Sequence, residues 1–119
     1  MRAELLETKT RQVRPRRSLA DRVREALVSL AEAQGQVLSH EEKAWASITF
    51  AGTRHELTLN FDGPEAVMAG ERFIAALPDH EFTIPGQLVA DAMVNSVSHT
   101  MLPVPRLAVT ATLLLLEDV

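Results

Sequence analysis

Residues 43–61, KAWASITFAGTRHELTLNF, decide the fold that we predict for this chain. Gly52 and Thr53 lie between two runs in which apolar side chains alternate with polar ones. Glycine reaches positive φ without a steric penalty, and as the first central residue it suits the type II′ turn that closes two-residue hairpins. The stretch therefore predicts two antiparallel strands closed at Gly52-Thr53.

This turn determines which residues face each other across the hairpin. Ala51 then pairs with Arg54, and the pairing continues outward to Ala44 and Phe61. A slip of one residue would set the leucines of the second strand across from Ser and Thr. One face should carry Ala44, Ala46, Ile48, Phe50, His55, Leu57, Leu59 and Phe61. This apolar face needs a cover, whereas Trp45 projects from the opposite, mostly polar face.

A helix is predicted directly before this hairpin. Ser18 followed by Asp21 has the form of a capping box with aspartate in place of the usual glutamate. Apolar residues then recur at helical spacing to about Gln34, and Gly35 is the expected stop. We expect this helix to cover the apolar face of the hairpin, with residues 37–42 as a short connection.

A second helix is predicted to begin after the turn residues Asp62-Gly63, at Pro64, because proline fits the first turn of a helix. It should run to about Leu77, before Pro78. Gly70 falls on its apolar side, where a missing side chain would let another backbone approach closely.

The last third of the chain predicts a second hairpin, from residues 87–99 through a proline-containing loop to residues 106–117. With that loop, Val97 should face Val109 and Met93 should face Leu113. Both faces are apolar around residues 88–93 and 113–116, as in strands that are covered on both sides. One cover would be a helix and the other a second subunit.

The predicted fold class is therefore α+β, with two α-β-β units whose antiparallel hairpins form a sheet covered by two helices. Residues 18–119 would form a single domain, and residues 1–17 a basic flexible arm. One face of the sheet is left to solvent or to a partner.

Composition limits the classes of function. The 119 residues include no cysteine, which excludes disulfides and thiolate chemistry. The net charge of −4 is unevenly distributed along the chain. Residues 1–26 contain eight basic and four acidic residues, whereas residues 27–119 contain four basic and twelve acidic residues. No apolar run approaches the roughly 20 residues that span a bilayer. We therefore expect a cytoplasmic protein that binds no membrane.

The basic arm suggests one possible partner. Arg11, Arg14, Arg16 and Arg17 are candidates for contact with nucleic-acid phosphates, since clustered guanidinium groups displace counterions. The alternative is a solvated tail, or one that docks on the acidic body of the same chain or a partner.

No motif of an enzyme is present: the chain lacks a glycine-rich phosphate loop, a His-Glu-x-x-His pair and a nucleophile elbow. We expect no cofactor and no metal site, and an enzyme is the less favoured interpretation. The remaining polar residues on apolar strand faces are candidates for lining a pocket, because a carboxylate or histidine there would have a shifted pKa. These residues are His55, Asp91, Asn95 and His99.

Three hypotheses of function follow. The first is a non-enzymatic binding or assembly module that self-associates, as a dimer, through sheet surface. Its candidate interface residues are Trp45, Met93, Val97, Leu113 and Leu115. The second is a nucleic-acid adaptor that uses the arm, and the third is a small-molecule binder or weak enzyme with a His/Asp pocket.

Overall fold

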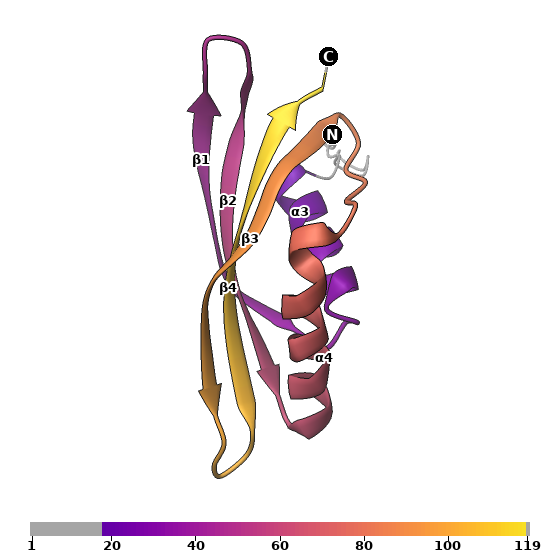
Figure 1. Ribbon diagram of the computed structural model, residues 1–119, viewed down its shortest axis with the longest axis vertical. Coiled ribbons are helices and arrows are strands. Elements are labelled where there is room, and N and C mark those ends of the chain that lie inside the picture. The colour runs from indigo at the N-terminus through magenta and orange to yellow at the C-terminus, as the bar shows by residue number, and fades with distance from the viewer. Residues whose placement is uncertain (1–17, 119) are drawn as a thin grey trace, which may run out of the picture.

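A computed structural model describes residues 18–118, so the basic arm with Arg11, Arg14, Arg16 and Arg17 lies outside the described residues. The elements follow the order α3 (Leu19–Leu30), β1 (Gln36–Ala46), β2 (Ala51–Asp62), α4 (Pro64–Ala76), the 3-10 turn η1 (Leu77–Asp79), β3 (Gln87–Thr100) and β4 (Arg106–Glu117). The four strands form one antiparallel sheet in the order β1-β2-β4-β3, and both helices lie on the same side of it (Figure 1). This confirms the α+β class and the order of two α-β-β units.

The two units meet at the centre of the sheet. β2 and β4 pair along their whole length, from Gly52 opposite Leu116 to Asp62 opposite Arg106. At the middle of this pairing Thr58 faces Thr110, and their hydroxyl oxygens lie 2.9 Å apart. Each unit therefore contributes one central strand and one edge strand.

The core lies between the sheet and the helix layer. Alternate residues of the central strands point toward the helices, as the period of two in a strand requires. The fully buried members from the strands are Leu57, Leu59, Phe61, Val109, Ala111, Leu113 and Leu115, and those from the helices include Val23, Leu27 and Phe73. Of the helices within residues 18–118, none lies over the other side of the sheet, which we call the open face.

α3 begins as predicted and ends earlier than predicted. The Ser18 hydroxyl accepts the Asp21 N–H, and the Asp21 carboxylate accepts the Ser18 N–H, which completes the capping box. The helix ends at Leu30, and Glu32 and Ala33 turn the chain with φ of 59° each. Gly35 is thus not the stop. A side chain there would lie 2.9 Å from the Phe61 ring, so glycine is needed for close packing.

α4 follows its prediction closely. Pro64 occupies the first turn, with Gly63 as the N-cap residue at φ 96°. Gly70 is buried, and a Cβ added there would lie 2.7 Å from a Leu107 methyl carbon and 2.9 Å from the Phe61 ring. The close approach inferred for Gly70 is confirmed, although its neighbours are side chains of the sheet.

The predicted turn of the first hairpin is wrong. The turn spans residues 47–50, where the Ser47 hydroxyl accepts the Phe50 N–H at 3.0 Å and the Ser47 N–H donates to the Phe50 carbonyl at 2.8 Å. Gly52 instead lies in β2 opposite Trp45, and Ile48 and Phe50 are exposed.

Two physical reasons explain this error. The local hydrogen bonds of Ser47 form a turn that needs no positive φ, so the glycine signal is misleading. The segment 37–42, predicted as a connection, belongs to β1 and lengthens the hairpin. Glycine is required at position 52 for another reason, because a Cβ there would lie 1.9 Å from the Leu115 carbonyl oxygen. The predicted alternation of β2 itself holds, since His55, Leu57, Leu59 and Phe61 are all buried.

The second hairpin has the predicted strands with two shifts in register. Val97 pairs with Val109 as expected, but Met93 pairs with Thr112 rather than with Leu113. β3 has irregularities between Val89 and Asp91 and between Val94 and Ser96. Each bulge adds one residue to β3, so it reverses which residues point toward the helices.

Candidate functional site

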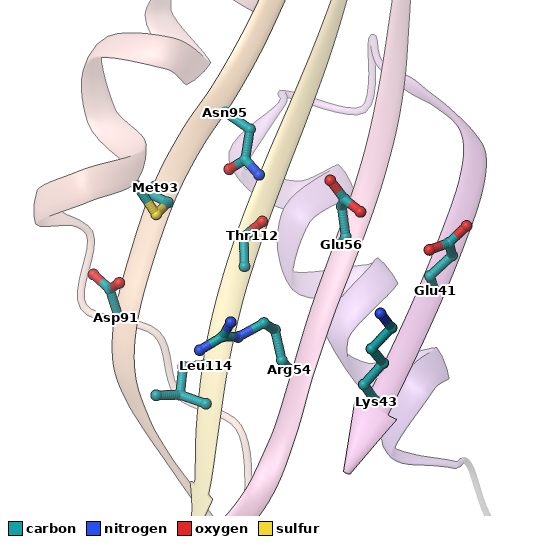
Figure 2. Close-up of a pocket in the computed structure, with 9 residues that line it drawn as sticks. All are labelled: Glu41, Lys43, Arg54, Glu56, Asp91, Met93, Asn95, Thr112 and Leu114. Atoms are coloured by element: carbon teal, nitrogen blue, oxygen red, sulfur yellow. The ribbon is translucent and has the colours of Figure 1, made fainter. Parts of the chain in front are cut away.

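The open face carries a shallow groove of about 300 Å³ across all four strands (Figure 2). Its lining residues are Glu41, Lys43, Arg54, Glu56, Asp91, Met93, Asn95, Thr112 and Leu114. They are brought together because cross-strand partners share a face of the sheet. More than half of them carry a charge, so this groove can bind a charged partner.

The four charges on β1 and β2 are sorted into two rows, which we call the positive row and the negative row. The fifth charge of the groove, Asp91 on β3, lies in line with the positive row, on the far side of Leu114. Lys43 on β1 pairs with Arg54 on β2 in the positive row, and Glu41 pairs with Glu56 in the negative row. Figure 2 shows the Arg54 side chain reaching over β4 toward Leu114. Within residues 18–118, none of these four side chains forms a hydrogen bond or ion pair.

An apolar row lies beside the positive row, toward the β1–β2 turn. Trp45 pairs with Gly52, Gly52 with Leu116, and Leu116 with Leu88. Leu88 is 56% exposed, and Met93 in the groove is 49% exposed. Large apolar side chains that stay in water beside a polar groove are typical of an interaction surface.

The five interface candidates from the sequence do not share one surface. Trp45 and Met93 lie on the open face, as their partners Gly52 and Thr112 show. Val97 shares the helix side of the sheet with Val109, although it is 47% exposed. Leu113 and Leu115 are fully buried in the core under the helices, so a partner has no access to them in this fold.

A second polar site lies on the helix side of the sheet, where α3 meets β1 and β2. The Arg24 guanidinium lies 3.0 Å from His40 Nδ1, His40 Nε2 lies 2.8 Å from His55 Nδ1, and His55 Nε2 lies 2.8 Å from the Thr53 hydroxyl. We call these four residues the histidine chain. Asp21 anchors its outer end by an ion pair with Arg24.

Both histidines of the chain resist protonation. Burial lowers the pKa of His40, and the charge of Arg24 lowers it further, while the carboxylate of Glu42 opposes both effects. Burial also lowers the pKa of His55, with Glu42 again opposing and His40 adding to the decrease. His55 is fully buried, so the cost of placing a charge there is the leading cause.

The four pocket candidates are not brought into one site. Asp91 and Asn95 line the open-face groove together. His55 points to the opposite side of the sheet, and exposed His99 lies opposite Leu107 near the end of the β3–β4 hairpin.

The contact between His40 and His55 is missed from the sequence because the predicted hairpin leaves residue 40 in a connection. Extending the alternation of β1 from Ala44 through Glu42 would put His40 on the same face as His55. Residues 18–118 contain no cluster of three or more His, Asp or Glu side chains that could hold a metal ion. In the histidine chain itself, the Arg24 cation lies against His40, which is unfavourable for a bound cation.

No protein-family model, curated protein or solved structure matches this chain. None of the helices within residues 18–118 is both long and apolar enough to cross a membrane. Function is therefore inferred from the geometry of the chain itself.

Proposed function

We propose that this protein is an assembly module whose open face binds the open face of a second copy. The observation that supports this proposal is the arrangement of the groove into a positive row and a neighbouring negative row. Like charges directly opposite each other on neighbouring strands destabilise a sheet. Lys43 beside Arg54 and Glu41 beside Glu56 are two such pairs. A partner that brings opposite charges to each row would relieve both repulsions.

A second copy of the same chain meets this requirement through simple symmetry. Consider a two-fold axis that runs across the strands, between the two rows and in the plane between two stacked sheets. Rotation about it places the positive row of one copy over the negative row of the other, so Lys43 meets Glu41 and Arg54 meets Glu56. Each of these four charges is then used once, as in the self-complementary interfaces of two-fold dimers.

The size of the open face is sufficient for a stable contact. The sheet has four strands of 11 to 14 residues. At about 4.8 Å between strands and about 3.3 Å per residue, it covers roughly 700 Å² on each copy. The resulting total of roughly 1,400 Å² exceeds the approximately 1,000 Å² of a specific interface. Burial of Leu88, Met93 and Leu114 would supply apolar contact around the charges.

Charge reversal tests this pairing directly. We expect the full chain to sediment as a dimer at micromolar concentration. Lys43→Glu/Arg54→Glu should be monomeric, and so should Glu41→Lys/Glu56→Lys, because each variant sets like charges against each other. An equimolar mixture of the two variants should form a mixed dimer, since one then presents two negative rows and the other two positive rows.

The matched control is Glu65→Lys/Glu71→Lys on the exposed side of α4, which changes the net charge as much and should leave the dimer intact. A monomeric wild type at high micromolar concentration would refute the proposal. Failure of the mixture to associate, with both variants folded by circular dichroism, would refute the pairing of the rows.

A further inference from the structure

We infer that the histidine chain is an acid-sensitive latch that holds α3 on the β1–β2 hairpin. This inference concerns the helix side of the sheet and is independent of the function proposed for the open face. Its basis is the hydrogen-bond geometry, which allows only one arrangement of protons.

The arginine determines both histidine tautomers. A guanidinium has only donors, so His40 Nδ1 must be the acceptor of the 3.0 Å contact with Arg24. The proton of neutral His40 is then on Nε2, from which it donates to His55 Nδ1. The proton of neutral His55 is accordingly on Nε2, and it donates to the Thr53 hydroxyl. All bonds of the chain run in one direction, away from Arg24.

The histidine chain cannot take up an added proton and keep all of its hydrogen bonds. If His40 takes it, the new N–H at Nδ1 faces the Arg24 guanidinium. If His55 takes it, the new N–H at Nδ1 faces the N–H of His40. Should His40 change tautomer to accept from His55, its own N–H again faces Arg24. Every placement sets two donors face to face, and in two of the three the lost bond is the one that ties α3 to β1.

Among residues 18–118, the surrounding charges come from two elements. α3 contributes Asp21, Arg24 and Glu25 around the groove beside the chain, and β1 contributes Glu42. From β4, the neighbour of His55 is apolar Leu113. Glu42 is thus the carboxylate that favours the charged form of both histidines. Burial and Arg24 outweigh it at His40, and burial and His40 outweigh it at His55, since both pKa values are lowered.

The direction of the pH effect follows from these lowered pKa values. A histidine whose pKa is lower in the folded than in the unfolded chain binds fewer protons when folded. The folded state therefore keeps its full stability above the histidine pKa of the unfolded chain, about 6.5, and loses stability as the pH falls below that pKa. Because the strained bonds join α3 to the hairpin, we expect α3 to open first.

Nitrogen-15 chemical shifts of the imidazole rings test the tautomers in the unmodified protein. At about pH 7.5, His40 and His55 should both carry the proton on Nε2. On acidification, each ring should become protonated only below the usual histidine pKa of about 6.5. A proton on Nδ1 of His40 at that pH would overturn the inference.

Hydrogen exchange tests the consequence. Between about pH 7.5 and about pH 5, the protection factors of α3 amides should fall by roughly tenfold or more relative to those of β4 amides. His40→Leu/His55→Leu removes both titrating groups and should abolish this difference. His99→Gln, which removes an exposed histidine outside the chain, should retain it. Equal losses in α3 and β4, or a loss that persists in the double variant, would refute the latch.

Discussion

The two α-β-β units use the same order of elements but attach their helices in different ways. In the second unit, α4 buries five residues, including Phe73 and Gly70, against the sheet. In the first unit, α3 buries two within its span, Val23 and Leu27. α3 adds a polar contact with the sheet, the bond from Arg24 to His40, and its own start is stabilised by the capping box. One helix is thus held by packing, and the other by packing together with directional bonds that respond to pH.

Removal of the largest side chain of α4 should have the largest effect. Phe73 is fully buried, and its ring centroid lies 5.9 Å from that of Phe61. Phe73→Ala should lower the free energy of unfolding by about 3–5 kcal/mol, the usual cost of a large cavity. Urea denaturation measures this loss. Met68→Ala, in the same helix at a mostly exposed position, is the control and should cost far less. A loss below about 1 kcal/mol for Phe73→Ala would show that α4 is not held by packing.

A smaller effect is expected from adding volume on the same helix. Gly70→Ala would place a methyl group 2.7 Å from Leu107 and 2.9 Å from Phe61. We expect a net loss of about 1–2 kcal/mol in urea denaturation, because overpacking outweighs the gain in helix propensity. Leu107→Val makes room, so the double variant should lose less than the sum of the single variants. If Gly70→Ala raised the unfolding free energy, the close approach would be unimportant.

The smallest effect tests the N-terminal cap of α3. Ser18→Ala removes the hydroxyl that accepts the Asp21 N–H. It should cost about 1 kcal/mol, measured by urea denaturation, with faster hydrogen exchange confined to the start of α3. Ser29→Ala, at an exposed position late in the same helix, is the matched control. Comparable losses in both variants would mean that the cap has no special role.

Patterns local in sequence predict most of the fold. The capping box at Ser18, Pro64 at the start of α4 and the alternation of β2 each depend on neighbours within a few residues, so they can be recognised directly. The first turn cannot, because Gly52 fits both a turn and the close approach of the Leu115 carbonyl oxygen. Only the fold reveals which of these requirements selected glycine.

The candidate sites are less accessible to prediction. Trp45 and Met93 are predicted on exposed sheet surface, and both lie on the open face. Leu113 and Leu115 are buried on the helix side, which could not be foreseen because a run of four leucines does not say which alternate pair faces the helices. The positive and negative rows depend on the strand register, which the misplaced turn shifts. The contact between His40 and His55 needs the true start of β1.

The bulges of the sheet have a consequence for how far an assembly can grow. All three irregularities lie in the edge strands β1 and β3, whereas β2 and β4 pair without interruption. A bulged edge offers an uneven series of backbone donors and acceptors, so another strand cannot extend the sheet easily. Growth by strand addition would be open-ended and would lead toward fibres. Stacking of one open face on that of a second copy buries both faces, so no third copy can bind there. The edges of this sheet therefore favour assemblies of finite size.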